Sequence, residues 1–172
     1  FVTCVHLCAT RSIHKWCEQQ SAVCSDLASS GIMANTDVLV IHVDADIANE
    51  PDLIRLHLTE RALSVRETCD CIRAHLSSLL GGGPMPAGVV LCVPAQCTEA
   101  WVFVALYPEE SLRYEPIEGR VEVERLLIGK RERLVRDKGG AAKKQPRNYS
   151  KVLGSITARW QTVVSRCMEA ER

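Results

Sequence analysis

The stretch Asp37-Val-Leu-Val-Ile-His-Val-Asp44-Ala-Asp46 joins an apolar, β-branched run to two carboxylates that are separated by one residue. An uninterrupted apolar run is typical of a buried parallel strand, and open α/β sheets bind ligands at the carboxyl ends of such strands. Side chains two positions apart on a strand point to the same side, so Asp44 and Asp46 can converge on one ion. Hard divalent cations prefer oxygen ligands, so we predict a strand over 38–43 followed by a Mg²⁺ or Mn²⁺ site. The alternative is a strand followed by an acidic, solvated loop.

The rest of the chain alternates helical and strand-like patterns. A second apolar run, over 88–93, predicts another strand that is buried on both faces. The expected helices cover 12–29, 64–80, 98–106, 121–136 and 150–171, with a polar loop over 109–119 and a basic, glycine-containing loop over 137–149. This order favours an α/β fold with a mainly parallel sheet flanked by helices, followed by a basic and mainly helical C-terminal part. The two apolar strands are expected to be central, parallel neighbours.

The 172-residue chain has a formal net charge of zero, but its charges are unevenly distributed. Residues 1–118 hold 7 Lys or Arg and 15 Asp or Glu, a net charge of −8, whereas residues 119–172 hold 14 and 6, a net charge of +8. We therefore predict an acidic α/β core over 1–118 and a basic, mainly helical extension over 119–172 that packs on it. The basic part either meets a polyanion or neutralises the acidic part.

Nine cysteines without a Cys-x-x-Cys pair argue against the common zinc-ribbon spacing. Several lie inside apolar helix or strand patterns, so we expect reduced and mostly buried thiols, as in a reducing cytoplasm. No apolar run is long enough to span a bilayer, and the N-terminus lacks the charged, apolar and small-residue regions of a signal peptide. The expectation is a cytoplasmic protein with no membrane partner.

A third carboxylate follows the second predicted strand, in the segment Pro94-Ala-Gln-Cys-Thr-Glu99-Ala-Trp101. Thr98 is a suitable helix N-cap, and an acid in the first turn is favoured by the helix dipole, which explains Glu99 structurally. In the functional interpretation Glu99 joins Asp44 and Asp46, because adjacent parallel strands bring their carboxyl ends together. Three carboxylates can hold one or two Mg²⁺ ions for phosphodiester cleavage, which makes Glu99 a candidate metal ligand and catalytic residue.

A basic segment, Lys143-Lys-Gln-Pro-Arg-Asn-Tyr-Ser-Lys151, leads into the last predicted helix. Its cations can neutralise phosphates and its aromatic ring can stack on a base, so we predict nucleic-acid contacts there. The candidate residues are Lys143, Lys144, Arg147, Tyr149 and Lys151. The alternative is a solvated loop.

These motifs together resemble the topoisomerase–primase (TOPRIM) fold. The resemblance rests on the strand that ends in Asp44-Ala-Asp46, on Glu99-Ala-Trp101 after a later strand, and on a Lys-x-Pro-x-x-Tyr stretch from Lys144 to Tyr149. It covers roughly residues 35–155 and is nearest to small bacterial relatives of the overcoming-lysogenization-defect nucleases, which are often linked with anti-phage defence. It implies Mg²⁺- or Mn²⁺-dependent phosphodiester chemistry on DNA or RNA, and an ATPase or other defence-system protein as a partner.

The chain departs from that family at its beginning. The family's first strand delivers a Glu, usually in a Glu-Gly-x-x-Glu setting, whereas the first acidic residue here is Glu18 inside a helical pattern. We therefore expect either a chain without its opening strand or a non-catalytic structural or regulatory subunit. The Asp44-Ala-Asp46 motif also resembles the Asp-x-Asp loop of nucleotide-sugar-dependent glycosyltransferases, which remains an alternative.

Overall fold

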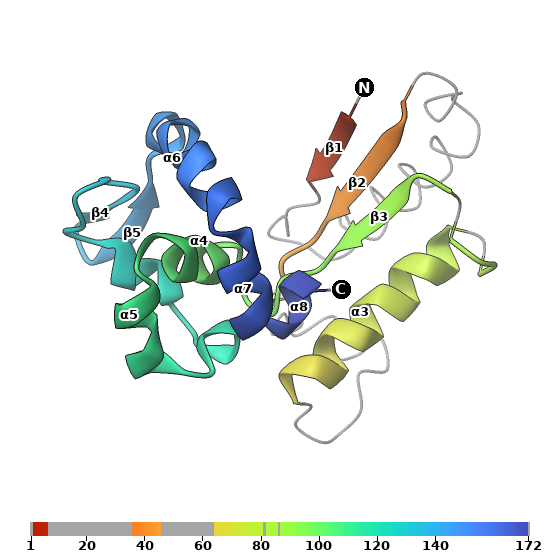
Figure 1. Cartoon of the computed structure of the whole chain (residues 1–172). Helices are drawn as coiled ribbons and strands as arrows, with labels where there is room; N and C mark the ends of the chain where they lie inside the picture. The colour runs from red at the N-terminus through yellow and green to blue at the C-terminus, as the bar shows by residue number, and fades with distance from the viewer. Residues whose placement is uncertain (1, 7–35, 46–63, 81, 86, 172) are drawn as a thin grey trace. The chain divides into compact units, whose positions relative to one another are not determined.

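The computed structural model describes residues 2–6, 36–45, 64–80, 82–85 and 87–171 (Figure 1). It divides the chain into two compact units, Phe1–Ala95 and Gln96–Arg172, and each is described by itself. The predicted helix over 12–29 and the predicted metal ligand Asp46 lie outside the described residues. Within the described part of the chain, no helix is long and apolar enough to cross a membrane.

The division between the units falls at residue 95, whereas the charge distribution predicted a boundary at residue 118. Compared with residues 119–172, the C-terminal unit therefore contains five additional Glu and one additional Arg. With residues 96–172 holding 15 Lys or Arg and 11 Asp or Glu, its net charge is +4, and that of residues 1–95 is −4. The two units thus differ in net charge by 8, whereas residues 1–118 and 119–172 differ by 16.

The first unit is built on a parallel sheet of three described strands, in the order β1 (Val2–His6), β2 (Val38–His42) and β3 (Val89–Cys92). Leu39 of β2 is in register with Val89 of β3, and the two strands run parallel as neighbours, which confirms that prediction. Their ladder continues beyond the strand ends, because the amides of Val43 and Ala45 donate to carbonyls of Cys92 and Pro94 at 2.9 Å. β2 is central among these strands.

The prediction that both strands are buried on two faces is wrong. Burial alternates along β2, where Leu39 and Ile41 are buried and the residues between them are half-buried. β3 is an outer strand of the described sheet, and Val90 is 46% exposed. An apolar side chain of this size at a partly exposed position is tolerated, so an unbroken apolar run does not by itself guarantee burial on both faces.

Helix α3 (Val65–Leu79) covers one face of this unit's core. It begins at a capping box in which Ser64 and Glu67 satisfy each other's backbone amides, and its buried residues recur at helical spacing. Cys69, Ile72 and Leu76 pack with residues at the ends of β2 and β3, and the whole cluster comprises Val43, Ala45, Cys69, Ile72, Leu76, Val93 and Ala95. The predicted helix over 64–80 is confirmed.

The second unit is organised around helix α4 (Glu99–Leu106), which has buried residues on every side. It packs against α5 (Pro108–Ser111), α6 (Pro146–Ala158) and α7 (Trp160–Arg166). Phe103 is fully buried, and its ring lies 5.4 Å from that of Tyr107 and 6.0 Å from that of Tyr114. An eight-residue helix that is apolar all round has to form a core, so α4 is the scaffold that positions its first residue, Glu99.

Three expectations for the C-terminal part are wrong in detail. The segment 121–136 is not a helix but a 3-10 turn, η5 (Val123–Leu127), followed by strand β4 (Val135–Lys138). Left-handed backbone at Glu122 and Arg133 interrupts helical geometry at both ends. The loop over 109–119 contains α5 and two 3-10 turns, η3 (Leu112–Tyr114) and η4 (Ile117–Gly119), and the last helix is divided into α6, α7 and α8 (Met168–Glu171). The architecture is therefore mixed α/β, with a parallel sheet and a separate antiparallel pair.

Candidate functional site

The basic segment forms a β-hairpin instead of the predicted loop. β4 pairs antiparallel with β5 (Ala141–Lys144), and Gly139 and Gly140 connect them (Figure 1). Both glycines have positive φ, 62° and 86°, which a tight two-residue hairpin turn requires. The carboxylate of Asp137 accepts the Gly140 amide at 2.8 Å and fixes the turn. A short, well-defined ribbon thus carries four of this unit's 15 Lys and Arg residues.

The hairpin has two faces of different character. Val135 is buried, and its cross-strand partner Lys144 reaches a buried carboxylate, so these residues mark the inner face. Side chains alternate along a strand, and directly opposed residues share a face. Arg136, Lys138 and Lys143 therefore lie together on the outer face, and all three are exposed. We call these three residues the cationic face.

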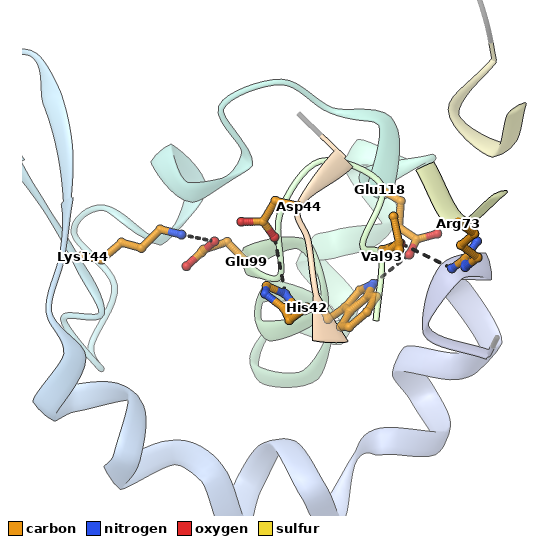
Figure 2. Close-up of polar contacts among 8 residues, drawn as sticks. His42, Asp44, Arg73, Val93, Glu99, Glu118 and Lys144 are labelled. Atoms are coloured by element: carbon orange, nitrogen blue, oxygen red, sulfur yellow. Dashed lines mark hydrogen bonds and ion pairs between the residues drawn. The ribbon is translucent and has the colours of Figure 1, made fainter. Parts of the chain in front are cut away.

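On the inner side, the hairpin is attached to α4 by a buried acid. Glu99 is 2% exposed, and its Oε2 lies 2.7 Å from Nζ of Lys144 (Figure 2). Its other oxygen, Oε1, accepts a hydrogen bond from the Tyr149 hydroxyl at 2.9 Å. One residue of α4 therefore holds both β5 and α6. A buried carboxylate needs such partners, because removing a charge from water without them is costly.

The surroundings of Glu99 raise the pKa values of two neighbouring side chains, the Cys97 thiol and the Tyr149 phenol. Burial raises the pKa of the Cys97 thiol, and the charge of Glu99 raises it further. Burial also raises the pKa of Tyr149, again reinforced by the charge of Glu99 and by the hydrogen bond to it. Both groups therefore remain protonated at neutral pH. Neither the thiol nor the phenol is activated as a nucleophile, so the cluster is suited to holding structure in place.

Further hydrogen bonds hold the hairpin at its base and at its tip. The backbone amide of Gln145 donates to the Leu134 carbonyl at 2.7 Å, which extends the hydrogen-bond ladder between β4 and β5. The Asn148 side chain donates to the Arg133 carbonyl at 2.9 Å. At the tip, Arg125 of η5 donates to the Gly140 carbonyl at 2.6 Å. The cationic face is therefore displayed on a pre-organised element.

A second buried acid in this unit has a structural role. Glu118 accepts a hydrogen bond from the indole of Trp101 at 2.7 Å, and the Glu169 amide donates to both of its oxygens, at 3.3 and 3.1 Å. Burial raises the pKa of Glu118, and the nearby Glu169 adds to the effect. Glu118 thus joins α4 to the first turn of α8.

In the first unit, Asp44 lies where the sequence predicted it, just past the end of β2. It shares a face with His42, two positions earlier, and the His42 Nε2 lies 3.5 Å from Asp44 Oδ1 (Figure 2). The buried neighbours Val43 and Ala45 point to the opposite, core-facing side. Among the described residues, no group of three or more His, Cys, Asp or Glu side chains is placed to hold a metal ion.

No family model, curated protein or solved structure matches this chain.

The predicted site residues fall into three groups. Lys143, Arg147 and Lys151 are exposed, as nucleic-acid contacts require. Lys144 and Tyr149 are instead directed at Glu99, so the expectation that the Tyr149 ring is available for base stacking does not fit its half-buried position. The metal-binding role of Asp44 and Asp46, and the metal-binding and catalytic role of Glu99, stay predictions. For Glu99, the structure shows both oxygens engaged by protein donors, which a metal ion would have to displace.

The sequence pattern extends the basic stripe to Arg136 but predicts a helix there. It therefore does not predict the pairing of Arg136 with Lys143, and it does not single out Lys138. The dipeptide Gly139-Gly140 carried the missing signal, because two glycines between short segments are typical of a hairpin turn.

Proposed function

We propose that this protein binds nucleic acid through the cationic face of its C-terminal unit. The observation that carries the proposal is the pairing of Arg136 directly opposite Lys143, with Lys138 on the same face. Like charges opposed across two strands destabilise a hairpin. No ion pair joins these three residues to a carboxylate in the described part of the chain. Such an arrangement costs stability unless an anion outside the chain occupies it, and a phosphate backbone is the polyanion that matches clustered Lys and Arg.

Neighbouring features support the same assignment. Arg147 and Lys151 are exposed on the first turns of α6, which directly follows the hairpin. The single acid of the hairpin, Asp137, lies on the other face and is engaged by the turn. The net charge of +4 on residues 96–172 would steer a polyanion towards this unit.

The first test of this proposal is the double substitution Arg136→Gln with Lys143→Gln. Each phosphate contact contributes about 0.9 to the slope of log affinity against log salt, so the slope should fall by roughly 1.8 and the affinity by about tenfold or more at low salt. Fluorescence anisotropy with labelled DNA and RNA at several salt concentrations measures both quantities.

The single variants Arg136→Gln and Lys143→Gln are measured as well, and Arg113→Gln is their matched control, because Arg113 is exposed in η3 and its loss gives the same change in net charge as each of them. We expect a clearly smaller effect from it. Absence of binding by the unmodified protein at low salt would refute the proposal, and equal losses from all three sites would show that only overall charge matters.

A second candidate function, metal-dependent phosphodiester chemistry, is supported by one feature of the first unit. Asp44 stands at the carboxyl end of a parallel strand, where α/β proteins bind ligands, and it has a histidine on the same face. A TOPRIM-like first unit with Asp44 and Asp46 on Mg²⁺ or Mn²⁺, activating a water for cleavage, is the finer proposal. A non-catalytic subunit of a cytoplasmic defence complex would retain nucleic-acid binding without this chemistry.

Titration with Mn²⁺ by calorimetry tests this second candidate. Binding should be seen with the unmodified protein and lost in the variant carrying Asp44→Asn and Asp46→Asn, because the carboxylates supply the negative charge that a divalent cation requires. Asp37→Asn is the control, since Asp37 lies at the opposite end of β2. Unchanged binding in the double variant would remove these residues from consideration.

A further inference from the structure

The tip of the hairpin is unusually slim. The residues between Lys138 and Lys143 are Gly139, Gly140, Ala141 and Ala142, so the turn and the start of β5 carry nothing larger than a methyl group, and the long side chain nearest the turn is that of Lys138, opposite Ala141. A Cβ atom added at either glycine would meet nothing within 4 Å. The two glycines and Ala141 are exposed, and Figure 1 shows the hairpin at the periphery of the second unit. Three cations therefore flank a narrow tip that has open space where the glycine side chains would be, with Arg125 bound at the Gly140 carbonyl.

We propose that the nucleic acid recognised by this unit is B-form duplex DNA, and that the β4–β5 hairpin enters its major groove. The inference rests on the proposed function and names its substrate class. A major groove about 12 Å wide admits a two-stranded β-ribbon, and the slim tip allows close approach. Arg136, Lys138 and Lys143 then meet phosphates and base edges from one face of the ribbon, where arginine and lysine pair with guanine acceptors.

The aromatic residues of the second unit argue against a single-strand site. Single strands are held by aromatic rings on which bases stack. In residues 96–171 every aromatic side chain is buried or half-buried, and most have partners within the unit. The ring of Trp101 meets Trp160 at 5.8 Å, and the Tyr149 hydroxyl is bonded to Glu99. The described surface of this unit therefore presents exposed cations on a narrow hairpin but no exposed aromatic ring on which a base could stack.

Duplex RNA fits the same ribbon poorly. Its A-form major groove is deep and narrow, so protein elements reach it far less easily than the groove of B-form DNA. The hairpin is also held rigidly by the Gln145, Asn148 and Arg125 hydrogen bonds at its base and tip. A rigid ribbon loses little entropy on insertion, but it cannot adapt to a narrower groove.

The test compares duplex DNA, single-stranded DNA and duplex RNA of equal length and matched sequence, by fluorescence anisotropy with the full chain. We expect duplex DNA to bind at least about tenfold more tightly than either of the others. Duplex RNA controls for total charge, because two duplexes of equal length carry the same number of phosphates. Equal affinity for the two duplexes, or tighter binding of the single strand, would overturn the inference and leave the proposed function standing. No binding of any of them would overturn both.

The variant Ala141→Trp separates groove entry from charge. Ala141 is exposed and lies on the face of the cations, opposite Lys138, so a large ring there thickens the tip without changing the net charge. Duplex-DNA affinity should fall about tenfold, whereas single-strand affinity should stay constant or rise because the new ring can stack. The matched control is Gln161→Trp, at an exposed position of α7, which should alter neither.

A competition experiment on the unmodified protein makes the test independent of how that variant folds. Methyl green, which occupies the major groove, should displace the protein from duplex DNA at concentrations where the minor-groove ligand netropsin does not. Displacement by netropsin alone would overturn placement in the major groove, as would unchanged duplex affinity in a folded Ala141→Trp variant.

Discussion

Replacing Glu99 by alanine is expected to lower the free energy of unfolding of the second unit by about 2–3 kcal/mol. The Tyr149 hydroxyl would lose its acceptor, and Lys144 would lose a 2.7 Å ion pair with a carboxylate that is 2% exposed. Breaking a fully buried pair costs about 3–5 kcal/mol. The Lys144 side chain is 49% exposed, so solvent screening reduces its share. Chemical denaturation in a Trp16→Phe background, in which Trp101 and Trp160 are the remaining tryptophans, measures the loss within this unit by fluorescence.

Two further substitutions at acidic positions sharpen this result. Glu99→Gln keeps one oxygen acceptor and should lose only about 1 kcal/mol. Glu109→Ala gives the same change in net charge as Glu99→Ala at an exposed position of α5, and should stay within about 0.5 kcal/mol of the unmodified protein. A Glu99→Ala variant as stable as the Glu109→Ala variant would show that the contacts to β5 and α6 contribute nothing.

Alkaline pH is expected to destabilise the same unit strongly. Burial raises the pKa of the fully buried Cys167 thiol from 9.0 to about 12, with a further contribution from the charge of Glu118. The pKa values of Cys97 and Tyr149 are raised as well. Over this range the folded state keeps protons that the unfolded chain has lost, so stability is fully present below about pH 9 and falls as the pH rises. Each group adds up to about 1.4 kcal/mol per pH unit to that slope.

Denaturation midpoints between pH 7 and 11, measured under reducing conditions, would show this fall. Cys167→Ala removes one titrating group and should flatten the slope above pH 9. Val163→Ala truncates another fully buried side chain of the same unit and should lower stability without altering the slope. If Cys167→Ala keeps the full slope, the buried thiol is not a source of the pH dependence.

Local patterns in the sequence predicted three described elements of the first unit, β2, β3 and α3. The apolar runs after Asp37 and after Gly88 are parallel neighbours, and helical spacing after Ser64 gives α3, which ends before the run of glycines. These predictions succeeded because a strand or helix with a continuous apolar stripe has few possible arrangements that bury the stripe. The residues that end each element, such as the glycines after α3, also act locally. How much of each strand is covered depends on the elements around it, which explains the misjudged exposure of Val90.

In the second unit local patterns were less decisive. The spacing of apolar residues over 121–136 suits a helix, but the chain instead turns at Glu122 and Arg133, where it adopts left-handed backbone, and then joins a hairpin. Short strands rich in alanine and lysine have weak intrinsic strand preference, so pairing and packing decide their conformation. The Gly139-Gly140 turn was the one strong local signal.

The two apolar strands, the helix that begins near residue 98 and the basic C-terminal segment were all predictable from local sequence. Which of the basic residues are available to a partner depends on contacts between residues that are far apart in the sequence. Lys144 and Tyr149 lie 45 and 50 residues from Glu99 along the chain, yet both bind its carboxylate. The physical reason is that a buried charge must find its partners wherever the fold brings them, and the alternation of β5 then leaves Lys143 facing outward.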